Sequence, residues 1–190
     1  MQNMLNRRAV LSLLASAAAT APAGAAEEHP AVGFVRQVAK ELLAAHRQGT
    51  TPAFLRVIQR YADVPEIAEY SLGKYSDKLQ NTQKPRYHRA VATYMARVLS
   101  MGSRDYTVSK YEVGAANPGK DKEVVVTSRV YLVTGQTYTV GWNLVMRGGK
   151  YKVRDIRVIL WLIPQQKSEF VSFLNKYDGD INRLILALLG

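Results

Sequence analysis

Residues 137–147 read TYTVGWNLVMR, and this stretch decides the fold class. Its side chains alternate between an apolar set and a largely polar set. The apolar set is Tyr138, Val140, Trp142, Leu144 and Met146, and the polar set is Thr137, Thr139, Gly141 and Asn143. A period of two residues predicts an antiparallel strand with one apolar face and one largely polar face.

The sequence on either side extends this strand into a sheet. Gly148 and Gly149 form a two-residue loop that permits a tight hairpin, so residues 151–162 are predicted to be the next strand, with Pro164 at its exit. Earlier strands are predicted over residues 106–113 and 123–133, joined by a turn at residues 117–121. Together these segments predict a four-stranded antiparallel sheet.

Helical periodicity surrounds the predicted sheet. Apolar residues recur every three or four positions over residues 32–47, 84–101, 170–177 and 181–189, and shorter helices are predicted from residue 51 and over residues 63–73. The fold class that follows is α+β, with a curved four-stranded antiparallel sheet packed against several amphipathic helices. We expect a cone-shaped hydrophobic cavity and the general shape of NTF2-like folds.

Residues 1–25 have the three parts of a secretory signal. Arg7 and Arg8 precede an apolar stretch over residues 10–21, and Ala23-Gly24-Ala25 supplies the small residues of a cleavage site. The apolar stretch is too short to span a bilayer. We therefore predict a cleaved signal peptide over residues 1–25, of Sec or twin-arginine type, and a single domain over residues 26–190.

The amino-acid composition limits the reactions, metal sites and partners that the sequence supports. The chain of 190 residues has no cysteine and three histidines, which argues against thiolate chemistry and leaves few ligands for a transition metal. Its net charge of +11 favours anionic partners, and export argues against nucleic acid. Recognisable enzyme motifs are missing from the sequence. Asp155, between Val153 and Ile156, is predicted to lie on a partly buried strand and to pair with Arg or Lys.

Three ordered motifs resemble the MlaC family, also called toluene-tolerance auxiliary proteins. Residues 63–75, DVPEIAEYSLGKY, are similar to the family segment D-x-P-x-I-A-x-x-x-L-G-x-Y. Residues 151–158, YKVRDIRV, are similar to its W-x-V-x-D-V-x-I strand, and residues 170–185 are similar to its C-terminal helices. Ser76 and Tyr151 stand where the family usually has Trp. These departures fit the hopanoid-associated HpnM branch about as well as they fit the MlaC branch itself.

The resemblance implies a periplasmic lipid carrier without enzymatic activity or a cofactor. Such a carrier binds phospholipid acyl chains as a monomer and shuttles lipid between an outer-membrane lipoprotein complex and an inner-membrane ABC transporter that has an MCE-domain subunit. We expect eight residues to contact lipid: Leu72, Tyr94, Met95, Val98, Tyr138, Val140, Trp142 and Leu144.

The sequence leaves three alternatives open. A hopanoid-associated paralogue would bind a different lipid, and a basic periplasmic adaptor would have a packed core without ligand. A small hydrolase or isomerase would use Asp155 as an acid or base. A cavity too small for one acyl chain would favour the adaptor.

Overall fold

The computed structural model describes residues 28–103, 105–157 and 162–190. The sheet consists of β1 (Val108–Pro118), β2 (Val124–Leu132), β3 (Thr137–Arg147) and β4 (Lys150–Arg157). These strands pair antiparallel in the order β1-β2-β3-β4, which is an open meander with β1 and β4 at its edges. The α+β class and the four-stranded antiparallel sheet are therefore confirmed.

Six α-helices accompany the sheet in the described residues. They are α1 (Pro30–Gln48), α2 (Thr51–Tyr61), α3 (Val64–Leu72), α4 (Lys84–Gly102), α5 (Leu162–Lys176) and α6 (Ile181–Leu189), with a 3-10 helix η1 (Gly73–Lys78) after α3. Pro30, Pro52, Pro65 and Pro85 occupy the first or second positions of α1 to α4. Proline suits this place because the first helical N–H groups have no partner within the helix.

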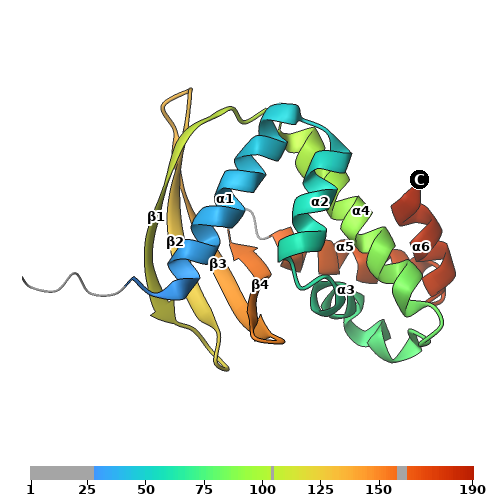
Figure 1. Cartoon of the computed structure of the whole chain (residues 1–190). Helices are drawn as coiled ribbons and strands as arrows, with labels where there is room; N and C mark the ends of the chain where they lie inside the picture. Colours follow the sequence, from blue (N-terminus) through green and yellow to red (C-terminus); the bar gives the residue numbers. More distant parts are fainter. Residues whose placement is uncertain (1–27, 104, 158–161) are drawn as a thin grey trace, which may run out of the picture.

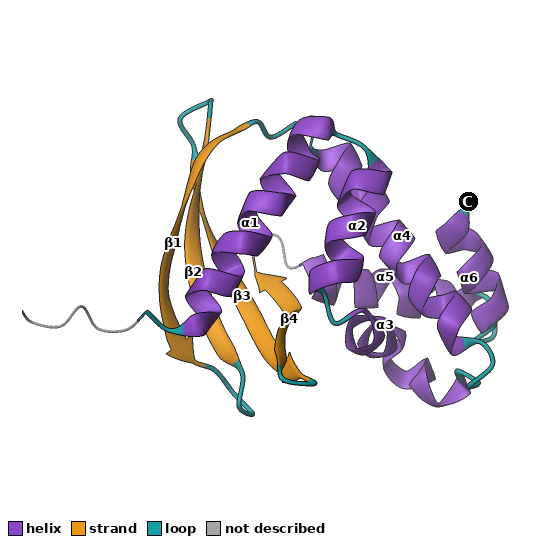
Figure 2. Cartoon of the chain, in the orientation of Figure 1, coloured by secondary structure: helices purple, strands orange, loops and turns teal. Residues whose placement is uncertain are grey.

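The molecule has two layers with α1 between them. In Figure 1 the sheet forms one side, α1 lies across it, and α6 with the C-terminus lies at the far end. Figure 2 shows the other helices gathered on the side away from the strands. Among the described residues, no helix is both long enough and apolar enough to cross a bilayer.

Three clusters of buried side chains hold these layers together. The first joins α1 to the sheet through Val35, Val38, Trp142 and Leu144, and the second joins α2 to α4. The third joins α3, α4, α5 and α6 around Tyr87 and Leu174. The amphipathic faces predicted from the sequence thus pack inside the molecule. Periodicity alone does not predict the helix or strand against which each face packs.

The last predicted strand is too long. β4 ends at Arg157, residues 158–161 lie outside the described part, and Leu162 begins α5. Pro164 therefore lies in the first turn of a helix and does not mark the exit of a strand. An apolar run such as residues 158–163 is compatible with a strand or with a buried helix, because periodicity alone does not separate the two.

The predicted faces of β3 also need correction. Asn143, assigned to the polar face, is only 3% exposed, whereas Met146, assigned to the apolar face, is 51% exposed. Val140, Trp142 and Leu144 are buried as predicted. Side chains on both faces of β3 are therefore buried near Asn143. Alternation along a strand predicts which face of the sheet a side chain lies on, but not which elements cover that face.

Candidate functional site

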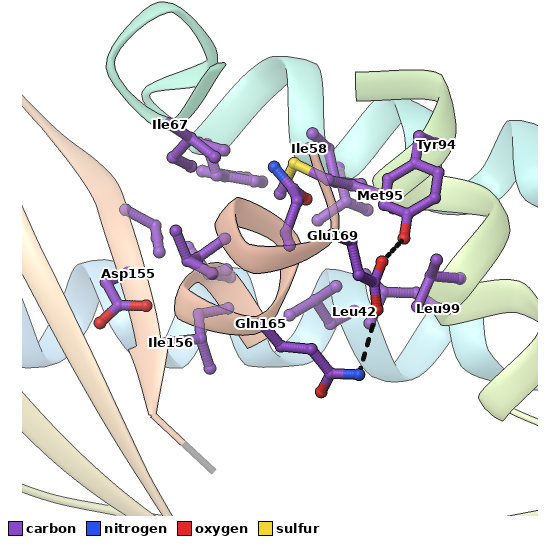
Figure 3. Close-up of a pocket in the computed structure, with 18 residues that line it drawn as sticks. Leu42, Ile58, Ile67, Tyr94, Met95, Leu99, Asp155, Ile156, Gln165 and Glu169 are labelled. Atoms are coloured by element: carbon purple, nitrogen blue, oxygen red, sulfur yellow. Dashed lines mark hydrogen bonds between the residues drawn. The ribbon is translucent and has the colours of Figure 1, made fainter. Parts of the chain in front are cut away.

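An apolar cavity of about 150 Å³ lies where the three buried clusters meet. Helices α1, α2, α3, α4 and α5 and strand β4 all contribute to its wall. Figure 3 shows the lining side chains, and its apolar part includes Val38, Leu42, Ile58, Ile67, Met95, Leu99, Val153 and Ile156. The cavity is therefore built from segments spread over most of the chain.

A short polar chain crosses one side of this cavity. The Tyr94 hydroxyl donates a hydrogen bond to Glu169 Oε2 at 2.6 Å, and Gln165 Nε2 donates to Glu169 Oε1 at 3.2 Å (Figure 3). Burial, followed by the hydrogen bond to Glu169, raises the pKa of Tyr94 to about 12. The hydroxyl thus stays protonated at neutral pH and links α4 to α5.

A second polar group is satisfied deep in the wall. Buried Gln166 donates from Nε2 to the Ser71 hydroxyl at 2.7 Å, and that hydroxyl donates to the Ile67 carbonyl at 2.7 Å. Since a buried amide without partners is costly, this chain explains how Gln166 can line an apolar cavity. It also fixes α5 against α3.

The α2–α3 junction is fastened to β4 next to the cavity. The Asp63 backbone N–H donates to the Val153 carbonyl at 2.8 Å, and the Asp63 carboxylate accepts from Arg147 Nε at 2.7 Å. Arg147 also donates to Glu66 at 3.0 Å. The first acidic residues of the DVPEIAEYSLGKY segment therefore dock α3 against the β3–β4 hairpin.

Asp155 lies on β4 and lines the cavity, with its Oδ2 accepting from Arg157 Nε at 3.4 Å. The prediction that this carboxylate pairs with a basic residue is confirmed. Asp155 therefore has two polar neighbours, Arg157 on β4 and Asn143, which is its direct partner on β3.

The structure brings together three of the eight residues predicted to contact lipid. Tyr94, Met95 and Val98, all on α4, line the cavity. Leu72 is fully buried in the cluster around Tyr87, and Tyr138 is half-buried near the start of β3. Val140, Trp142 and Leu144 pack beneath α1. Lipid contact by any of the eight stays a prediction, and the cavity wall favours the α4 residues.

Sequence reasoning missed most of the cavity wall. Leu42 and Ile58 lie on helical stripes that it did identify, but a stripe that lines a cavity looks the same as one that packs against a neighbour. Gln166 and Glu169 lie on α5 but before the helix predicted over residues 170–177, so the predicted boundaries gave no signal for either residue.

An open antiparallel sheet, a helical layer and an apolar cavity between them define a class of small α+β proteins. Within this class, the family model for the MlaC protein matches residues 35–189. The chain therefore belongs to the MlaC family.

A solved structure supports the fold. The phospholipid-binding protein from Ralstonia solanacearum, determined in complex with a phospholipid, matches with a TM-score of 0.66 at 20% sequence identity. The match covers 83% of this chain and 94% of that chain. No curated protein matches the chain.

Proposed function

We propose that this protein is a periplasmic phospholipid carrier that encloses acyl chain in the cavity beside α4. The observation that carries the proposal is an apolar cavity in a chain of the MlaC family. The phospholipid complex of the structural neighbour supports it. Export by the predicted signal over residues 1–25, which lies outside the described residues, would deliver the carrier to the periplasm.

The physical task of a carrier is to keep acyl chain out of water. Each CH₂ group left in water costs about 0.8 kcal/mol, so an acyl chain of about 16 carbons costs on the order of 13 kcal/mol. Apolar side chains such as Leu42, Met95 and Ile156 offer the required environment. Donor and acceptor complexes in the two membranes, with the ABC transporter and its MCE-domain subunit on the inner side, complete the proposed route.

The present cavity volume sets a condition on this proposal. A cavity of about 150 Å³ is comparable to an engineered protein cavity that accepts benzene, which is smaller than an acyl chain. Lipid entry must therefore widen the space between α4, α5 and β4. The hydrogen bond from Tyr94 to Glu169 lies on that path and would break or lengthen during opening.

The small cavity also favours a second candidate, a basic adaptor with a ligand-free core. Mass spectrometry under native conditions, on the protein purified from its own envelope, separates the two. The carrier is expected to appear with intact phospholipid bound, and a hopanoid in its place would identify the paralogue. A mass equal to the bare mature chain would overturn the carrier and support the adaptor.

A cavity-filling variant tests where the lipid lies. Met95→Trp adds volume inside the cavity and is expected to lower the co-purifying lipid several-fold. Val133→Trp is the matched control, because Val133 is exposed after β2 and does not line the cavity. Equal loss of lipid in both variants would argue against this cavity as the lipid site.

A further inference from the structure

A second cavity, of about 580 Å³, lies directly beside the first. The two share Ile67, Asp155 and Ile163 in their walls, so these residues form the boundary between them. The second cavity is open to solvent, and its other sides are lined by the turn between β1 and β2, by Asn143 of β3 and by Tyr70 of α3. A ligand with one apolar and one polar end could occupy both spaces across this boundary.

The wall of the second cavity lacks the excess of positive charge that the whole chain has. Its wall contains four acidic residues, Glu66, Asp121, Glu123 and Asp155, and three basic residues, Lys120, Arg154 and Arg157, on a chain of net charge +11. Arg154 is already paired, with Glu66 at 3.2 Å and with Glu123. Arg147 also pairs with Glu66, at 3.0 Å, and Arg157 pairs with Asp155, at 3.4 Å, so positive and negative charges are close to balanced at this wall. A balanced wall suits a ligand that carries both a positive and a negative group.

Two oxygen acceptors in this wall have no hydrogen-bond donor among the described residues. They are Oδ1 of Asn143 and Oδ1 of Asp155. Asn143 is 3% exposed and forms part of the cavity wall. Asn143 and Asp155 are direct partners in the β3–β4 register. Side chains of directly opposed residues lie on the same face of a sheet, close together. Buried acceptors are nearly always satisfied, so this pair calls for a donor from a ligand.

We propose that the second cavity binds a phospholipid headgroup that ends in a primary ammonium, as in phosphatidylethanolamine. The ammonium has three N–H donors and one positive charge, which match the Asn143 amide oxygen and the Asp155 carboxylate. The phosphate lies toward Lys120, which makes no ion pair within the described part of the chain, and toward Arg157. This inference rests on the proposed phospholipid function and adds a headgroup preference to it.

The preference has a direct chemical contrast. A choline headgroup carries the same charge on a trimethylated nitrogen, so it has no N–H donor for Asn143 or Asp155. Two lipids with identical acyl chains and different headgroups therefore separate headgroup recognition from burial of acyl chain.

The experiment is a competition for lipid capture. The full-length mature protein is incubated with vesicles of equimolar palmitoyl-oleoyl phosphatidylethanolamine and palmitoyl-oleoyl phosphatidylcholine, then re-isolated, and its bound lipids are quantified by mass spectrometry. We expect about tenfold enrichment of phosphatidylethanolamine, the equivalent of one charge-assisted hydrogen bond. In Asn143→Leu the ratio is expected to return to within about twofold of the vesicle composition.

Two further variants keep the test sound. Asp155→Asn removes the charge at a less buried position and is expected to lower the same enrichment, which covers the case in which Asn143→Leu does not fold by circular dichroism. Glu112→Gln changes an exposed carboxylate of β1 outside both cavities and is expected to keep the native ratio.

Failure of the two proposals gives different results. Capture of both lipids in the vesicle ratio, or an enrichment that survives in folded Asn143→Leu and Asp155→Asn, would overturn the headgroup site and leave the carrier intact. Capture of neither lipid would overturn the carrier and the headgroup site together.

Discussion

His46, in the last turn of α1, makes stability depend on pH. Burial, with a smaller effect of the neighbouring Arg47, lowers the pKa of His46 below 6.5. The unfolded chain therefore binds more protons just below pH 6.5, so this contribution to stability is fully present above 6.5 and is lost as the pH falls through the folded pKa. Urea unfolding at about pH 7.5 and about pH 5.5 should show a smaller loss for His46→Gln than for the native protein. Equal losses would contradict this account.

Asp63 is the residue that fastens the α2–α3 junction. Its buried carboxylate accepts from Arg147, and Arg147 is itself half exposed. We expect Asp63→Ala to lower the free energy of unfolding by about 1–2 kcal/mol, because a hydrogen bond between charged groups is lost and solvent screens part of it. Glu112→Ala, which removes an exposed ion pair with Lys110 and a hydrogen bond from Tyr131, should have a much smaller effect, because water screens an exposed ion pair. Similar values for both variants in urea unfolding would refute the special role of Asp63.

At the scale of elements, the junction between α3 and η1 depends on Gly73. Its backbone has φ 53° and ψ −123°, a conformation that residues with a Cβ atom rarely adopt. A Cβ atom at this position would also lie 3.0 Å from Val171 Cγ2 of α5. Gly73→Ala is thus expected to destabilise the protein by about 1–3 kcal/mol in thermal or urea unfolding.

Gly33 provides the matched control for this prediction. It lies inside α1, and a Cβ atom there would meet nothing within 4 Å. Gly33→Ala should be neutral or stabilise the protein by up to about 1 kcal/mol, because alanine is the better helix former. If both variants behaved alike, the strain at Gly73 would not explain the L-G-x-Y motif.

At the scale of the whole molecule, Leu144 and Val98 differ in their place in the fold, because Leu144 packs in the core away from the cavity whereas Val98 lines it. Leu144 is fully buried beneath α1, so Leu144→Arg would bury a charge without a partner and is expected to abolish folding. Val98 lines the cavity but is 39% exposed, so Val98→Arg should fold and lose most of its co-purifying lipid. Circular dichroism and lipid extraction measure both effects. A folded Leu144→Arg protein with depleted lipid would instead place the acyl chain against β3.

Much of the local structure follows from the sequence alone. The period of two over residues 137–147 and the glycine pair after it predicted the β3–β4 hairpin, and helical periodicity predicted α1 and α4. The family motifs predicted MlaC membership. These signals are readable because strand alternation, helix periodicity and the first turn of a helix depend on neighbouring residues in the chain.

Only the tertiary structure decided which buried faces meet. The sequence did not show that α1 would cover Trp142 and Leu144, so that the cavity beside α4 lies against β4 and α5 and not against β3. Nor did it show that Asn143, on the predicted polar face, would be buried opposite Asp155. An amphipathic pattern records that a face avoids water, whereas the partner of that face is set by packing between elements far apart in sequence. The cavity is the space that this packing leaves unfilled.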